Sequence, residues 1–244
     1  MKKFFRFLIV LIIIVGGCAG YFFLANNKMM VSVLKADKDA LSTTLNNSIK
    51  KVHDYGNFNF TYSQDDRTTK TKTNSQILVK FDGENRYFSA EVTTIKDDKT
   101  TNTSYYCEAK GDVATLYITS GEEKKYHVTT WDLALVEAKI PLYITNVFLA
   151  NDYEISKDNF VERFKSSSVT FSFKPFYYGA RLESDKDGEN VKFDISNRGI
   201  LRRIEATTKS LVLDKTDTLI VNKPGKAVSI NSLSDEQKKA YSLF

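Results

Sequence analysis

The chain has 244 residues and a net charge of +5, and its composition excludes several classes of protein. Four of the 35 basic residues and none of the 30 acidic residues lie within residues 1–28, so the rest of the chain is almost neutral. A nucleic-acid-binding domain needs a concentrated basic surface, which residues 29–244 do not supply. With only Cys18 and Cys107, the chain also cannot be a small disulfide scaffold, and a hydrophobic core must stabilise it.

An apolar segment without charged residues runs from residue 7 to residue 25. A helix of that length spans about 28 Å, close to the thickness of the hydrocarbon core of a bilayer. Lys2, Lys3 and Arg6 precede it, and basic residues favour the cytoplasmic side. We therefore expect a protein of the cell membrane, with residues 29–244 on the extracytoplasmic side.

Three processing outcomes are open for this segment. It can remain as a single-pass signal anchor, be cleaved near Gly17-Cys18-Ala19, or be lipidated on Cys18. The stretch VGGC resembles the bacterial lipobox, which makes Cys18 a lipidation candidate. The apolar continuation AGYFFLA after Cys18 favours the uncleaved anchor, because lipoproteins usually continue with a polar tether. All three outcomes export the rest of the chain.

Residues 29–52 have the periodicity of one amphipathic helix. Apolar residues recur there at spacings of three, four and seven residues, which places them on one helical face. They are Leu34, Leu41, Leu45, Ile49 and Val52. We expect the helix to end before Gly56.

The pattern then changes to a period of two, which predicts strands with one buried face. Successive alternating stretches are NFNFTYS, SQILVKFD, RYFSAEVTTI, TSYYCEA, VATLYIT and KYHVTTW, spaced by short polar turns. Short connections of this kind are typical of an antiparallel meander. Residues 132–165 interrupt it with helix-like sequence, and strands resume from residue 168. A capping box from Ser234 to Gln237 predicts a short terminal helix.

This order of elements divides the chain into residues 1–28, the anchor or signal, and residues 29–244, one α+β domain. A helix, a meander, a helical insertion, further strands and the stretch KPGKAVSI resemble the LolA/LppX superfamily of extracytoplasmic lipoprotein and lipid carriers. The resemblance implies a half-barrel, in which helices cover the open side of a curved antiparallel sheet. It also implies that acyl chains are held between sheet and helices.

Apolar residues on the predicted strands and mid-chain helices are candidates for lining such a ligand cavity. They are Phe58, Phe60, Phe81, Leu116, Ile118, Trp131, Leu135, Ile144 and Phe148. The same residues would equally build the ordinary core of a sheet. The first interpretation predicts a lipid-binding protein, and the alternative is a cell-surface structural or interaction protein with a filled core.

The sequence offers no motif for catalysis, for a metal or for a cofactor, so we expect a protein that is not an enzyme. His53 and His127 are the only histidines, and neither lies in a metal-binding pattern. Expected partners are the membrane, a lipid ligand and a surface protein. The pairs Lys50-Lys51 and Arg202-Arg203 are either small basic strips that face anionic lipid heads or plain solvated faces.

Overall fold

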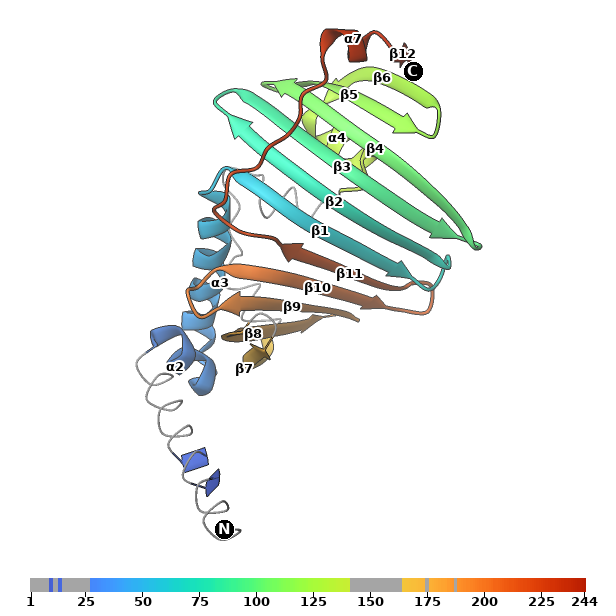
Figure 1. Cartoon of the computed structure of the whole chain (residues 1–244). Helices are drawn as coiled ribbons and strands as arrows, with labels where there is room; N and C mark the ends of the chain where they lie inside the picture. Colours follow the sequence, from blue (N-terminus) through green and yellow to red (C-terminus); the bar gives the residue numbers. More distant parts are fainter. Residues whose placement is uncertain (1–8, 11–12, 15–26, 141–163, 174–175, 187) are drawn as a thin grey trace.

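The structure is a computed structural model, and it describes residues 9–10, 13–14, 27–140, 164–173, 176–186 and 188–244 (Figure 1). These residues form a curved, open antiparallel sheet accompanied by short helices, as expected for the α+β class. The helices are α2 (Lys28–Lys35), α3 (Lys38–His53), α4 (Trp131–Glu137) and α7 (Asp235–Lys238). The first six strands are β1 (Asn57–Asp66), β2 (Thr71–Asp82), β3 (Asn85–Lys96), β4 (Lys99–Lys110), β5 (Val113–Ser120) and β6 (Glu123–Thr130). The others are β7 (Phe164–Phe173), β8 (Phe176–Lys186), β9 (Glu189–Ser196), β10 (Leu201–Lys209), β11 (Asp214–Val221) and the two-residue β12 (Ser242–Leu243).

Two antiparallel meanders make up this sheet. Strands β1–β6 pair in sequence order, as predicted, and so do β7–β11. The meanders join where β1 pairs with β11, in a register that sets Phe60 opposite Val221. At the far edge, β12 pairs in parallel with β6.

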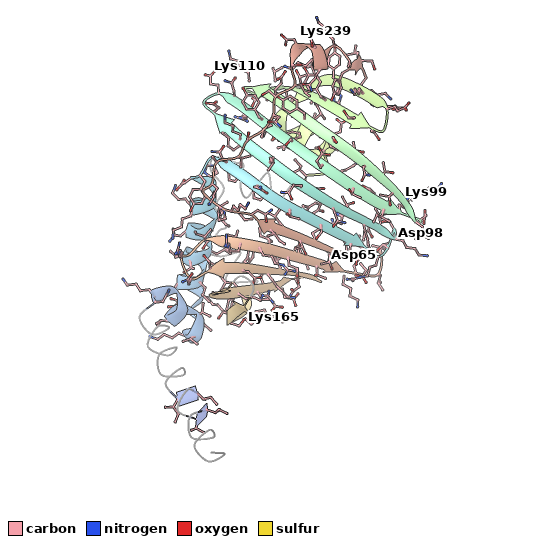
Figure 2. All side chains as sticks on the ribbon, viewed as in Figure 1. Asp65, Asp98, Lys99, Lys110, Lys165 and Lys239 are labelled. Carbon is pink, nitrogen blue, oxygen red and sulfur yellow. The ribbon has the colours of Figure 1, made fainter. Side chains whose placement is uncertain are left out.

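Turn chemistry fixes the hairpins that separate the strands. Asp97 and Asp98, between β3 and β4, have φ values of 49° and 60°. Two consecutive left-handed residues make a type I′ turn, whose twist matches that of the flanking strands. Figure 2 shows Asp98 at the tip of this hairpin. The conformation of this turn therefore accounts for the two adjacent aspartates.

The predicted helix at residues 29–52 is wrong in one respect, because two helices occupy this stretch. Ala36 adopts a left-handed φ of 51°, and Asp37 caps α3 by accepting a hydrogen bond from the backbone N–H of Ala40. A capping aspartate starts a new helix at the point where the earlier one ends. The break turns Leu34 outward, where it is 60% exposed, while Leu41 and Leu45 are fully buried.

The hydrophobic core lies on one face of the sheet, which we call the inner face. Apolar residues of α3 and α4 belong to the same buried cluster as the inward side chains of the strands. Helix α3 packs near β9 and β10, and α4 packs near β5 and β6. The two helices therefore cover two different parts of the same face.

Several predicted features lie outside the described residues. They include Cys18, the expected helices at residues 141–163 and most of the apolar segment at residues 7–25. No helix in the described part of the chain is long and apolar enough to cross a membrane. The membrane anchor therefore stays a prediction.

Candidate functional site

The structure brings the described cavity candidates together on the inner face. Phe58 and Phe60 come from β1, Phe81 from β2, Leu116 and Ile118 from β5, and Trp131 and Leu135 from α4. Phe60, Leu116 and Leu135 are fully buried, and Phe58 and Trp131 are almost so. Phe81 and Ile118 are partly buried and pack against the same cluster. Ile144 and Phe148 lie outside the described residues.

The aromatic members form a continuous chain of ring contacts from β1 to α4, which we call the inner cluster. Phe58 stacks on Phe60 with 5.5 Å between ring centroids and meets Phe81 edge-on at 5.9 Å. Phe81 lies 6.2 Å from Trp131, and Phe88 lies 5.5 Å from Trp131. These distances are typical of favourable aromatic pairs.

Strand register and one helix cap position these rings. Phe58 lies opposite Val79, which in turn lies opposite Phe88, so the rings of β1 and β3 share a face. Helix α4 directly follows β6, and the Thr130 side chain accepts a hydrogen bond from Leu133 N–H as its N-cap. Trp131 thus enters the inner face from the first position of α4.

Phe88 was not among the predicted site residues, although its ring is fully buried and lies against Trp131. The signal was present, since Phe88 alternates with Ala90 and Val92 in the predicted strand. The opposite end of the same core, where Leu45 and Leu41 of α3 lie, was also not considered as part of a site.

The inner face changes from apolar to polar along β1. Beyond Phe60, Tyr62 donates a 2.6 Å hydrogen bond to Asp217 Oδ1, and Gln64 Nε2 donates to the same oxygen at 2.9 Å. Lys215 lies 3.0 Å from Asp217 Oδ2. Tyr62 is paired across the strands with Ser75, whose Oγ is buried and has no hydrogen-bond partner in the described part of the chain. We call these residues the polar end of the inner face.

Among the described residues, the titratable groups near the inner cluster include a buried thiol and a histidine–carboxylate pair. Burial raises the pKa of the Cys107 thiol to about 12, so this cysteine stays protonated and is a poor nucleophile. His127 Nε2 of β6 lies 3.0 Å from Glu137 Oε2 of α4. Within the described ranges, no group of three or more His, Cys, Asp or Glu side chains is placed to hold a metal ion.

A second aromatic cluster, the outer cluster, occupies the opposite face of β4–β6. Tyr117 stacks on Tyr126 with ring centroids 5.9 Å apart and meets Tyr241 of the C-terminal segment edge-on at 5.2 Å. Lys238 of α7 donates to both Glu108 carboxylate oxygens, at 2.7 and 2.9 Å. This cluster was not predicted from the sequence, since only the folded chain brings residues 238–241 to β4 and β5.

Comparisons with known proteins give little beyond this geometry. No protein-family model matches the chain, and no curated protein matches its sequence. Among solved structures, the chain is similar to the crystal structure of LprF from Mycobacterium bovis, with 9% sequence identity and a TM-score of 0.49. The similarity covers 78% of this chain and 95% of LprF. At these values the similarity carries no weight for function, which must be argued from the site itself.

Proposed function

We propose that this protein is tethered to the membrane on its extracytoplasmic side and binds a lipid or another apolar ligand between the sheet and the helices, without catalysing a reaction. The observation that supports this proposal is the inner cluster, an aromatic surface beneath a short helix that leads to a polar end. A ligand with an acyl chain and a polar head has the same division along its length.

The construction of the roof over the inner cluster favours entry of a ligand. Helix α4 spans seven residues and buries Trp131, Ala134 and Leu135. Trp131 N–H, at the start of α4, donates to the carbonyl oxygen of Asp112 in the β4–β5 turn. The rest of the helix belongs to no strand, so it can move away from β5 about this first residue without breaking a ladder hydrogen bond. Ligand sites commonly open through the displacement of such covering elements.

The polar end supplies a partner for a ligand head group. The Ser75 hydroxyl is buried and has no hydrogen-bond partner among the described residues, and an unsatisfied buried polar group costs about 1–3 kcal/mol. A hydroxyl, an amide or an ester of a bound ligand would remove that cost. The neighbouring Tyr62 and Asp217 make the site polar on the same side.

The tether is proposed from residues 7–25. Ile9, Val10, Ile13 and Ile14 are helical and between 48 and 66% exposed. Contact of such side chains with hydrocarbon instead of water is favourable, by about 25 cal/mol per Å² of apolar surface. The tether would hold the binding domain beside the bilayer that contains its ligand.

Cys18 decides the chemical nature of the tether. If the helix is the anchor, Cys18→Ser leaves the protein in the membrane fraction after an alkaline carbonate wash. If the Cys18→Ser protein is instead released, and lacks an acyl mass that the unmodified protein carries on Cys18, the tether is assigned to lipidation. Either result leaves the ligand-binding proposal to be tested separately.

Native mass spectrometry of the full-length chain extracted from membranes tests ligand binding. We expect a lipid mass on the folded protein, and Ser75→Ala should reduce the bound fraction, because the variant loses a hydrogen bond to ligand but none to the protein. Ser63→Ala, on the other face of β1, is the matched control and should retain the lipid. Absence of lipid from the unmodified protein under conditions that keep it folded would end the proposal.

A second function is favoured by how tightly the inner cluster is packed. Its rings contact one another, and Phe58, Phe88 and Trp131 are each at most 4% exposed, as in an ordinary filled core. Val113 and Val128, each 63% exposed on neighbouring strands of the outer face, would then serve as contacts for a surface protein. Absence of bound lipid, combined with loss of partner capture in a Val113→Asp variant, would establish this alternative.

A further inference from the structure

A pocket of about 230 Å³ lies between α3 and the β9–β10 turn, and its lining residues include no member of the inner cluster. Figure 1 shows this turn beside α3. The pocket is lined by Lys51 and Arg198, by hydroxyl and amide side chains, and by Gly199, and no carboxylate is among its lining residues. Its volume far exceeds the ~15 Å³ that one water molecule needs.

Local structure holds the ammonium group of Lys51 against the wall of this pocket. Lys51 Nζ donates a 2.9 Å hydrogen bond to the carbonyl oxygen of Arg198, which fixes the lysine over the turn. Gly199 has a left-handed φ of 67°, and a Cβ atom at this position would lie 3.1 Å from Lys51 Nζ. Glycine therefore allows the turn to form and leaves room for the ammonium group.

No residue that the structure describes neutralises the two charges in the pocket. Lys51 uses one of its three donors on Arg198, and Arg198 has no ion pair with any residue in the described ranges. The neighbouring Lys50, in contrast, lies 3.0 Å from Asp54, and Arg203 is paired with Glu205. Two uncompensated cations beside Thr44 and Asn47 form a donor-rich recess, which suits an anion with several oxygen acceptors.

The pocket lies next to the point where the chain leaves the predicted anchor. Asn27 Nδ2 donates to the carbonyl oxygen of Asn197 at 3.2 Å, and the apolar segment ends at residue 25. Lys28 lines an adjoining pocket that shares Thr44 with the first. A bilayer around residues 7–25 would bring its head groups close to both lysines, and anionic lipids attract cations placed at their surface.

We propose that this pocket binds a phosphate group. Phosphodiester lipid head groups and free inorganic phosphate share the chemistry that the pocket offers. The lipid source rests on the tether proposed above, whereas the phosphate site itself does not.

In the first arm of the test, inorganic phosphate is titrated into the full-length chain in detergent. Binding is measured by calorimetry at constant ionic strength, with chloride as the reference anion. We expect saturable binding that Lys51→Gln and Arg198→Gln each weaken about tenfold, the effect of losing a charged hydrogen bond. Lys50→Gln is the matched control on the same helix and should leave binding unchanged. Thermal unfolding of each variant verifies that it is folded.

The second arm places the full-length chain in nanodiscs of phosphatidylglycerol or of phosphatidylcholine and measures lysine acylation by mass spectrometry. Saturable phosphate binding together with slower acylation of Lys51 than of Lys50 in either lipid, relative to detergent, supports the site and identifies a lipid head group as its source. Phosphate binding without such protection also supports the site and identifies free phosphate. No saturable phosphate binding, or equal effects of the Lys50 and Lys51 substitutions, overturns the proposal. Neither result depends on whether lipid is found at the inner cluster.

Discussion

Strands β4 and β5 carry an aromatic or apolar cluster on each face, and the two differ in chemistry. On the inner face, Cys107 and Leu116 belong to the same buried cluster as the aromatic rings of the inner cluster, Trp131 among them. On the outer face, Tyr106 and Tyr117 lie beside the ion pair between Glu108 and Lys238. The inner cluster is assembled mainly from strands that follow one another in the chain. The outer cluster needs the C-terminal segment, more than a hundred residues away. The same two strands thus support one cluster that should be insensitive to pH and one that depends on charge.

The largest expected effect is on the inner cluster. Phe88→Ala removes a fully buried ring and should lower the free energy of unfolding by about 3–5 kcal/mol. Denaturant unfolding of the full-length chain in detergent measures this loss. Tyr87→Ala, the next residue and on the outer face, is the matched control and should cost less. Equal losses at the two positions would show that the inner cluster is not the better packed of the two faces.

The outer cluster should respond more weakly to the loss of its ion pair. Lys238 and Glu108 are 27% and 29% exposed, so we expect Lys238→Ala to cost about 1 kcal/mol. The amide of Phe244, which donates to the carbonyl oxygen of Tyr126, should exchange faster in this variant. Lys239, exposed beside it at the end of α7, supplies the control substitution Lys239→Ala (Figure 2). Unchanged hydrogen exchange at the Phe244 amide would show that the ion pair does not hold the C-terminal segment in place.

The two clusters should also differ in their response to alkaline pH. The hydrogen bond to Glu108 raises the pKa of Lys238, and burial raises the pKa of Tyr117. In both residues folding favours the protonated form, so their contribution is complete below about pH 10 and is lost as the pH rises through the raised pKa values. Tyrosinate absorbance should therefore show a late-titrating fraction, which Tyr117→Phe diminishes. A titration in which every tyrosine ionises at the ordinary pKa would contradict the burial of Tyr117.

The smallest expected effect is at Cys107 of the inner face. Because burial raises the pKa of this thiol to about 12, iodoacetamide at neutral pH should leave it unmodified in the folded protein. Denaturation should make it reactive, as peptide mapping of the segment with Cys107 would show. Rapid modification without unfolding would mean that the inner cluster opens readily, which would itself favour entry of a ligand.

Much of the first meander could be predicted from sequence because its information is local. Alternation of Phe58, Phe60 and Tyr62 defines one face of β1, and the Asp97-Asp98 turn ends β3. The capping box at Ser234 is also confirmed, with both of its reciprocal hydrogen bonds. Each of these features depends on residues within a few positions of one another. The site was predicted in part for the same reason, since Phe81 and Trp131 lie on elements that the pattern identified.

Other features escaped prediction because they depend on pairs that are distant in sequence. The polar end was missed, although Ser75 continues the alternation of Ile77 and Val79, because a hydroxyl on a strand is ordinarily assigned to the wet face. The burial of Ser75 follows from its pairing with Tyr62 and not from its own chemistry. The break at Ala36 was missed because the apolar spacing of α3 extends by chance to Leu34.

By itself, the sequence determined the type of most described elements, the direction of the apolar face of each strand and the existence of an apolar N-terminal segment. Periodicity and turn residues encode these properties over short distances. Only the tertiary structure decided that β1 pairs with β11, that Lys238 reaches Glu108 and that Lys51 meets the turn at Arg198. Each of these contacts joins residues more than a hundred positions apart, and the closure of such long loops leaves no local pattern in the sequence.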